Sequence, residues 1–352
     1  MGDHDMSDLA EEVVSLTFFC PIMKTLMRDP VICADGHSYE RASIEHWLRT
    51  HNTSPATGAE LANRTVTPNH TLRKAIEEHL ERTFKTVPLS SIDFGPKIGE
   101  GSFKTVHEGT LSRGGREVKV AVLKMRDNAE IGAEVQALVK LGRHANLVRF
   151  MGMCTEGPQP ILLTELAPLG SLDSFLEERE GQVAAAHKLA MAQQICSGMV
   201  ALAEIQLVHR DLAARNVLVF DFDAASAAAT RVKVSDFGLA VNAYGATHMT
   251  VNDGGQAPFR WMPPEALRRR RFSEKSDVWA FGVTLWEIFT DALIPYRDLS
   301  SDQLVHQHVT GGGRLPQPPS CPPEMWEVMT RCWADTPAER PGFEELMTLI
   351  PR

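Results

Sequence analysis

The sequence predicts an α+β protein of two domains, with the smaller domain first. Three observations support this prediction. Residues 13–84 contain one short hairpin pattern and two helical apolar patterns. Residues 92–352 begin with strand-like alternation around a glycine-rich turn and continue with mixed strand and helix patterns. Between the two segments, residues 85–91 read KTVPLSS, a stretch with a proline and few apolar side chains that predicts a linker.

The composition is that of a soluble globular protein, with 43% hydrophobic and 23% charged residues among 352. A net charge of −9 provides no basic excess, so we expect no nucleic-acid partner. No apolar run is long enough to span a bilayer, so we expect no membrane insertion. The acidic first residues predict no signal peptide, and six irregularly spaced cysteines favour a cytoplasmic location, with a nuclear one left open. The sequence carries no indication of oligomeric state.

The small domain is expected to combine a hairpin with two helices. Residues 31–39 predict the hairpin, because Asp35 and Gly36 supply a turn between two short strand patterns. Apolar residues at helical spacing predict the helices. They are Ile44, Trp47 and Leu48 in the first helix and Leu72, Ile76 and Leu80 in the second.

Two cysteines raise the question of a zinc site in the small domain. Zinc ligands usually come as close pairs, but Cys20 and Cys33 are thirteen residues apart. The histidines His37, His46 and His51 do not complete a ligand spacing. We therefore expect no zinc, and we interpret both cysteines as small buried apolar residues.

Several short motifs in this segment occur together in one order. They are CPI at 20–22, DPV at 29–31, GHSYER at 36–41, WL at 47–48 and PN at 68–69. With them, the segment resembles a U-box. The resemblance implies a metal-free, RING-like platform in which hydrogen bonds and ion pairs replace the metal sites. It also implies docking of a ubiquitin-conjugating enzyme through Ile22, Trp47 and Pro55, although core packing is an alternative role for Trp47.

The second segment contains VHRDLAARN at 208–216, VSDFGLA at 234–240 and PFRWMPPEAL at 258–267. Together these motifs resemble the catalytic core of protein kinases, and the resemblance covers residues 92 to about 350. It implies a bilobal fold, with an N-lobe at about 92–165 and a C-lobe at about 166–352. It also implies ATP as cosubstrate and a protein as substrate.

Phosphoryl transfer depends on positioning and on neutralising the charge of the triphosphate. By the family pattern, Asp211 orients the proton of the substrate hydroxyl, and Asn216 and Asp236 hold Mg²⁺ through oxygen atoms. Kinases that act on serine and threonine usually carry a lysine at the position of Ala213. Arg215 instead matches the pattern of tyrosine kinases, so we expect a tyrosine-directed catalytic site.

The nucleotide end departs from the family pattern. Gly99 and Gly101 allow the backbone to approach phosphates, but Lys104 stands where a third glycine is usual. Val106 follows on the same strand and is expected at the nucleotide. Thr164 is expected behind the adenine. Glu165 and Ala167 are expected to supply backbone hydrogen bonds to it.

Lys124 is the predicted ligand of the α- and β-phosphates. Kinases usually have alanine two residues before this lysine, whereas Ala121 is three before it. Two explanations are open: Val122 crowds the adenine site, or a bulge restores Ala121 to it. Glu134 is the expected partner of the lysine, with Glu130 in reserve.

Three further predictions concern the activation loop, one ion pair and an insertion in the second segment. By the family pattern, Arg210 should hold a phosphate on the activation loop, residues 236–265, where Tyr244 is the candidate for self-phosphorylation. Glu265 should pair with Arg340. The alanine-rich residues 221–230 suggest a flexible insertion between two strands. Three functions remain open: an active kinase joined to a ligase, a pseudokinase scaffold for the ligase, and a ligase whose kinase domain only recruits substrates.

Overall fold

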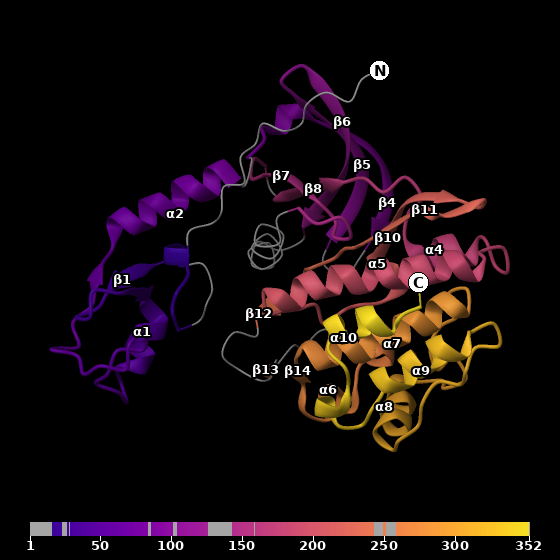
Figure 1. Cartoon of the computed structure of the whole chain (residues 1–352). Coiled ribbons are helices and arrows are strands. Elements are labelled where there is room, and N and C mark those ends of the chain that lie inside the picture. Colours follow the sequence, from indigo (N-terminus) through magenta and orange to yellow (C-terminus); the bar gives the residue numbers. More distant parts are fainter. Residues whose placement is uncertain are drawn as a thin grey trace. The chain divides into compact units, whose positions relative to one another are not determined.

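A computed structural model describes residues 16–22, 27, 29–83, 86–100, 104–125, 143–157, 159–242, 249–250 and 258–351 (Figure 1). The chain divides into two compact units, Met1–Thr83 and Phe84–Arg352. In its described residues, the first contains a small sheet and two α-helices, and the second contains a five-stranded sheet and many helices. The predicted α+β class is therefore confirmed. None of the described helices is long and apolar enough to cross a membrane.

The small unit is built on a three-stranded antiparallel sheet in the order β2-β1-β3. Its elements are η1 (Leu16–Phe18), β1 (Pro30–Ile32), β2 (Ser38–Glu40), α1 (Arg41–Trp47), β3 (Thr67–Pro68) and α2 (His70–Thr83). Val31 lies opposite Tyr39 on one side and Pro68 on the other. The predicted hairpin is confirmed, and Gly36 adopts the positive φ of 77° that its turn requires. Cys20 and Cys33 are buried in the core, as expected.

Polar contacts connect the loops and helices of the small unit. Asp29 accepts hydrogen bonds from Arg41 Nε at 2.6 Å and from Arg73. The bond from Arg41 lowers the pKa of Asp29 below its ordinary value. The Tyr39 hydroxyl donates to Asp35 at 2.6 Å. Among the described residues, no group of three or more His, Cys, Asp or Glu side chains is placed to hold a metal.

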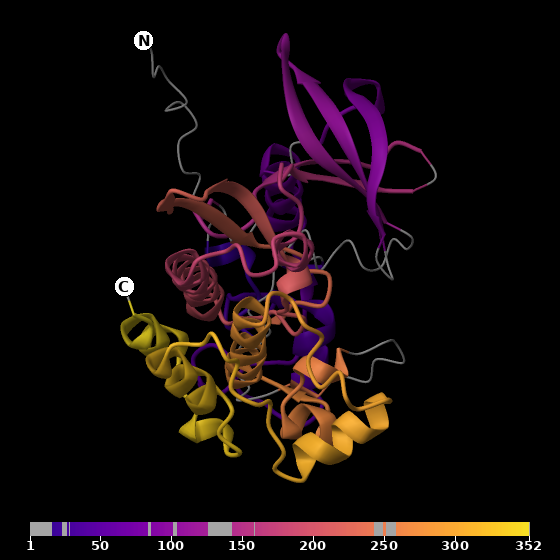
Figure 2. The same cartoon turned by 90° about the vertical axis from the view of Figure 1, so that its right-hand side faces the viewer.

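The second unit begins with the five-stranded antiparallel sheet, in the order β4-β5-β6-β8-β7. Its strands are β4 (Ile92–Glu100), β5 (Lys104–Arg113), β6 (Arg116–Met125), β7 (Phe150–Cys154) and β8 (Ile161–Glu165), and η2 (Leu89–Ser91) precedes them. In Figures 1 and 2 this sheet lies at one end of the unit and the helices lie at the other. This arrangement agrees with the bilobal fold that the resemblance implies.

Helices dominate the remainder of the unit. They are α4 (Leu172–Glu177), α5 (Ala185–Glu204), α6 (Pro264–Arg269), α7 (Glu274–Phe289), α8 (Asp302–Thr310), α9 (Pro323–Cys332) and α10 (Phe343–Leu349), with the short helices η3 (Ala214–Asn216), η4 (Phe259–Trp261) and η5 (Pro337–Glu339). The short strands β9 (Leu207–Val208) and β12 (Val241–Asn242) pair with each other, as do β13 (Met249–Thr250) and β14 (Arg271–Phe272). The main core forms around α5 and α7.

Helix α7 is the most buried of these helices. It begins at a capping box, in which Ser273 and Ser276 exchange hydrogen bonds between side chain and backbone. All residues from Ser276 to Phe289 are buried. At Gly282 a Cβ atom would lie 2.7 Å from Cys332 Cβ and from Trp333 Nε1. The missing side chain therefore allows the end of α9 to approach α7 closely.

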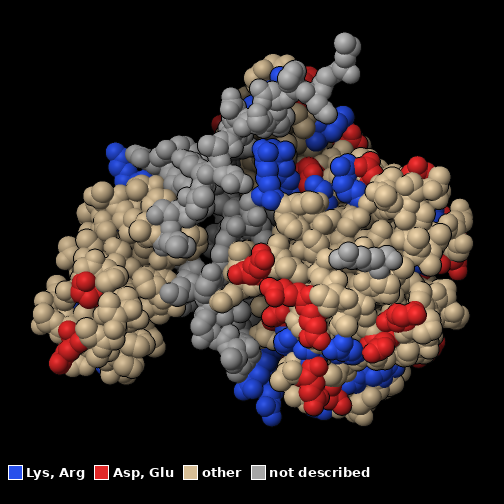
Figure 3. All heavy atoms as spheres, viewed as in Figure 1, with Lys and Arg blue, Asp and Glu red and all other residues tan. Residues whose placement is uncertain are grey.

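The alanine-rich segment differs in part from the prediction of a flexible insertion between two strands, because the strands themselves extend into it. It forms a regular hairpin of β10 (Val217–Asp223) and β11 (Ser226–Val234). Alanine has low strand propensity, but Val219 and Val232 face each other in the ladder and are both fully buried. Packing of such flanking residues explains why the strands extend into the alanine-rich part. On the face shown in Figure 3, acidic and basic side chains are interspersed over this unit.

Candidate active site

A cavity of about 720 Å³ lies between the strands of the five-stranded sheet and the loops that follow β9 and β11. Residues predicted from the sequence contribute much of its lining. They are Gly99, Val106, Thr164, Ala167, Asp211, Arg215, Asn216 and Asp236. Lys124 and Glu165 are not among the described residues that line it. Gly101, Glu130, Glu134 and Tyr244 lie outside the described residues.

Asp211 is held by its neighbours in the loop after β9. Asn216 Nδ2 donates to the Asp211 carboxylate at 2.8 Å and to its carbonyl at 2.7 Å, and Arg215 also donates to the carboxylate. Burial raises the pKa of Asp211, although the charges of Arg215 and His209 act in the opposite direction. A raised pKa makes the carboxylate a better proton acceptor near neutral pH.

Arg215 is oriented by an aromatic ring and a buried acid. Its guanidinium carbon lies 4.3 Å from the centroid of the Trp261 ring. Trp261 Nε1 in turn donates to Glu287 at 2.9 Å, and the same carboxylate oxygen accepts the backbone N–H of Ala214 at 2.9 Å. Glu287 therefore connects residues 209–216, which we call the catalytic loop, to the segment that contains Trp261.

Asp236 adopts a left-handed backbone conformation with φ 64°. Its carboxylate accepts a hydrogen bond from Lys104 Nζ at 2.8 Å. Burial acts to raise the pKa of Asp236, but the charge and hydrogen bond of Lys104, together with the charge of His209 and the Gly238 N–H, outweigh burial, so the pKa lies below its ordinary value. The carboxylate is therefore ionised, as a ligand for a hard cation must be.

The pairing of strand β6 shows which of its residues face the cavity. It pairs residue by residue with β5 and with β8 from Val120 to Lys124. Ala121 and Leu123 line the cavity, whereas Val122 is fully buried in a cluster on the opposite face. Neither explanation offered above is correct, because Ala121 lies at the cavity without a bulge and Val122 does not crowd it.

The same alternation removes Lys124 from the cavity. Successive side chains of a strand point to opposite faces, so Lys124 shares the face of Val122. Its Nζ lies 4.4 Å from the centroid of the Phe94 ring, and Phe94 is 41% exposed. The structure therefore disagrees with the prediction that Lys124 lies at the nucleotide phosphates, and it places Lys104 in the cavity instead.

Strands β6 and β8 form the part of the cavity where adenine is expected. Thr164 pairs with Ala121 across these strands, and both residues line the cavity. The carboxylate of Glu165 accepts hydrogen bonds from Lys233 Nζ at 2.6 Å and from the backbone N–H of Arg149 at 2.7 Å. That side chain thus connects β8 to β11 and to the segment before β7.

Arg210, the predicted phosphate ligand of the activation loop, has a positive φ of 70°. Its Nη1 donates to the carbonyl of Leu239 at 3.1 Å, and its guanidinium lies 4.6 Å from the centroid of the Phe272 ring. The Asp277 carboxylate accepts the backbone N–H groups of His209 at 2.6 Å and of Arg210 at 2.9 Å. These two bonds connect the catalytic loop to α7.

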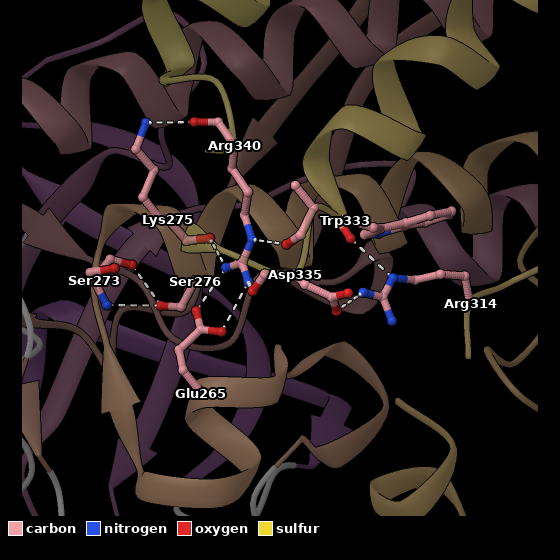
Figure 4. Close-up of polar contacts among 9 residues, drawn as sticks. Glu265, Ser273, Lys275, Ser276, Arg314, Trp333, Asp335 and Arg340 are labelled. Carbon is pink, nitrogen blue, oxygen red and sulfur yellow. Dashed lines mark hydrogen bonds and ion pairs between the residues drawn. The ribbon is translucent and has the colours of Figure 1, made fainter. Parts of the chain in front are cut away.

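The predicted pair of Arg340 and Glu265 is present (Figure 4). Two guanidinium nitrogens donate to the Glu265 carboxylate at 2.7 and 2.9 Å. Arg340 also donates to the carbonyls of Lys275 and Ala334, and its side chain has 0% exposure. This forked pair is a strong, geometrically specific contact between the start of α6 and the segment before α10.

In the small unit, the predicted docking residues are partly buried. Ile22 and Trp47 pack against the core, and Pro55 begins a turn. Trp47 Nε1 donates to the carbonyl of Thr53 at 2.8 Å, and its ring stacks on His51 at 4.0 Å between centroids. Trp47 therefore has a structural role in holding the loop that contains Pro55, in addition to its partly exposed surface.

Sequence reasoning missed the positions of two residues, one that supports the site and one that lines its cavity. Glu287 gave no motif signal, because its partners Ala214 and Trp261 are distant in sequence. Lys104 did give a signal, as the lysine in place of a third glycine, but its role depends on which face of β5 it occupies.

Comparison with known proteins supports the same division of the chain. The family model described as protein tyrosine and serine/threonine kinase matches residues 92–350, and the U-box domain model matches residues 14–85. The tyrosine-protein kinase Srms of Mus musculus is 40% identical over 259 residues, which are 73% of this chain and 50% of that protein. The tyrosine-protein kinase ABL2 of Homo sapiens is 40% identical over 252 residues, which are 71% of this chain and 20% of that protein.

A third relative is named as inactive. The inactive tyrosine-protein kinase 7 of Gallus gallus is 34% identical over 292 residues, which are 78% of this chain and 27% of that protein. The chain thus spans about half or less of the length of these three relatives. The family match over residues 92–350 shows that the chain belongs to the protein tyrosine and serine/threonine kinase family, with a U-box domain ahead of its kinase domain.

Proposed function

We propose that the larger domain is an ATP-dependent protein-tyrosine kinase and that the smaller domain recruits a ubiquitin-conjugating enzyme. The observation that most supports kinase activity is the meeting of Asp211, Asn216 and Asp236 around one cavity. Asp211 would accept the proton of the substrate hydroxyl. Positioned proton transfer of this kind typically contributes about 10²- to 10⁴-fold to a rate.

Asn216 and Asp236 suit Mg²⁺. Asp236 is ionised, and because Asn216 Nδ2 donates to Asp211, the other polar atom of its amide is an oxygen acceptor. Carboxylate and amide oxygens are the donors that this cation prefers. Bound there, Mg²⁺ would neutralise charge on the ATP phosphates.

Tyrosine specificity is supported by the residues beside Asp211. Ala213 replaces the lysine usual in serine and threonine kinases. Arg215 is held between Asp211 and the Trp261 ring. The relatives at 40% identity are both named tyrosine-protein kinases.

Incubation of the full chain with Mg²⁺ and ATP tests the kinase proposal, with Asp211→Asn as the matched control. We expect phosphotyrosine on the wild type or on an added tyrosine-containing protein, and none with the variant. Asp211-dependent phosphothreonine alone would contradict tyrosine specificity. The absence of any Asp211-dependent signal would contradict the activity itself.

The U-box is proposed to dock a ubiquitin-conjugating enzyme through Ile22, Trp47 and Pro55. A partly exposed apolar cluster of this kind is typical of docking surfaces. Because no nucleophile is proposed in this domain, its contribution would be orientation of a thioester formed elsewhere. Addition of a strong chelator should leave the unfolding of this domain unchanged, and a lowered midpoint would contradict a metal-free U-box.

A scaffold without kinase activity is the second candidate. It is favoured by the position of Lys124 outside the cavity and by the similarity to a relative named as inactive. The experiment with Asp211→Asn distinguishes the two candidates, because a scaffold needs no Asp211-dependent phosphorylation.

A further inference from the structure

We propose that Lys104, and not Lys124, is the lysine that binds the nucleotide phosphates. The inference rests on the proposed ATP-dependent activity of this domain and names a residue that replaces the one predicted from the sequence. Lys104 is the first residue of β5, and it is the only lysine among the described residues that line the cavity.

The position of the Lys104 ammonium is set by strand geometry. Lys104 and Val106 are two residues apart on β5, so they share a face, and both line the cavity. The Lys104 side chain is only 12% exposed, and its Nζ lies 2.8 Å from Oδ1 of Asp236. Asp236 is the carboxylate proposed to hold Mg²⁺ against the phosphates. The ammonium is therefore already at the place where the triphosphate must approach.

Lys124 is kept out of the cavity by two ladders. It pairs with Thr105 on β5 and with Ile161 on β8, so β6 is held on both sides at this residue. A change of face would require those pairings to shift, because a slip by one residue reverses every side chain of a strand. Leu123, which is 7% exposed, lines the cavity beside Val106, its partner in the ladder.

The chemistry of an ammonium suits this role. It carries three donors on a flexible stem, so a bond to Asp236 is compatible with contacts to phosphate oxygens. When the nucleotide binds, Lys104 would neutralise phosphate charge from the strand that follows the glycine-rich turn. A lysine in place of the third glycine is then a functional substitution.

A pair of identical substitutions tests the proposal in the full chain. We define the ATP preference as the dissociation constant of adenosine divided by that of ATP, both measured by calorimetry with Mg²⁺. In Lys104→Met, we expect this binding ratio to fall about ten- to a hundredfold, because ATP binds more weakly. We expect kcat/KM for phosphoryl transfer to fall about 10²- to 10³-fold. The matched Lys124→Met should change both quantities less than about twofold, since its ammonium lies outside the cavity.

A relocation experiment sharpens the test. In the double variant Lys104→Met with Leu123→Lys, a lysine returns to the cavity face of β6, and we expect most of the ATP preference and activity to return. A greater loss in Lys124→Met than in Lys104→Met, equal losses in both, or no loss in either would overturn the proposal.

The binding ratio separates this inference from the proposed function. If Lys104→Met lowers the preference for ATP while the wild type transfers no phosphate, the kinase activity is wrong and the role of Lys104 stands. If the wild type transfers phosphate and Lys104→Met does so equally well, the activity stands and the role of Lys104 is wrong.

Discussion

At the residue scale, burial decides the protonation of carboxyl groups that connect the catalytic loop to α7. Burial raises the pKa of Glu287 to about 7 and the pKa of Asp277 to about 6. Both accept backbone N–H groups from the catalytic loop. A buried carboxyl group with a raised pKa favours its neutral form, so these contacts depend on pH.

Glu287 gives a prediction on stability. Its folded pKa of about 7 exceeds its ordinary value of 4.5, so its contribution is fully present below about pH 4.5 and is lost as the pH rises through 7. Glu287→Gln, a permanently neutral analogue, should become more stable relative to wild type between about pH 5 and pH 8, by roughly 3 kcal/mol at most. Urea unfolding followed by tryptophan fluorescence measures the difference.

The exposed Glu327 supplies the control, since Glu327→Gln makes the same chemical change at the surface of α9. If the stabilities of Glu287→Gln and wild type change in parallel with pH, Glu287 has the same pKa in the folded and unfolded states, and the prediction is wrong.

Arg340 gives a second prediction at this scale. Arg340→Ala would leave the partly buried Glu265 without its forked partner, and loss of one member of a buried ion pair costs about 3–5 kcal/mol. Arg340→Lys should recover only part of this stability, because an ammonium lacks the fork. Urea unfolding of the kinase domain measures both variants.

Arg297, which is 60% exposed in its pair with Asp298, is the matched control. Arg297→Ala should change stability by less than about 0.5 kcal/mol. A loss in Arg340→Ala no larger than this would mean that the buried pair contributes nothing measurable.

At the scale of elements, helix packing and strand register decide what residue types mean. In an exposed helix, replacement of glycine by alanine stabilises by about 1 kcal/mol. At Gly282 the added Cβ would lie 2.7 Å from atoms of Cys332 and Trp333. Overpacking of this kind typically costs about 1–3 kcal/mol. Gly282→Ala should therefore destabilise the kinase domain, as read by its unfolding midpoint.

Gln303→Ala, on the exposed side of α8, tests helix propensity without a close contact and should leave the midpoint unchanged or slightly higher. A Gly282→Ala midpoint above that of the wild type would mean that α7 and α9 separate at little cost.

Prediction of the elements succeeded where the pattern was local. The hairpin at Gly36 followed from its turn residues, and α1 followed from apolar spacing. The two strands around the alanine-rich residues were expected, but their extension into these residues was missed, because alanine-rich sequence has weak strand propensity. Its pairing is stabilised by valines such as Val219 and Val232, whose burial depends on the rest of the core.

At the scale of the whole molecule, two domains with separate cores predict that mutations can separate the two proposed activities. Ile22→Ala removes apolar surface from the proposed docking site of the U-box. It should therefore abolish the discharge of ubiquitin from a conjugating enzyme that carries ubiquitin as a thioester, while phosphorylation continues. Asp211→Asn should do the reverse. Discharge and phosphotyrosine assays on the same preparations measure both outcomes. Loss of phosphorylation in Ile22→Ala would show that the activities depend on each other.

The sequence by itself determined the order of the domains, their α+β class and the acidic centre of the kinase domain. Asp211, Asn216 and Asp236 lie in short motifs, where neighbouring residues constrain one another through local contacts such as the bond from Asn216 to Asp211.

Only the tertiary structure decided which lysine enters the cavity. Lys104 lies on β5 and Lys124 lies on the adjacent β6. The pairing of β6 with β5 and β8 turns Lys124 away from the cavity face that Lys104 occupies. That register is set by long-range pairing and by burial of Ala121 and Leu123 on one face and Val122 on the other. Side chains alternate along a strand. Lys124 comes one position later after Ala121 than the lysine of the usual kinase pattern, so it faces away from the cavity, whereas Lys104 faces into it.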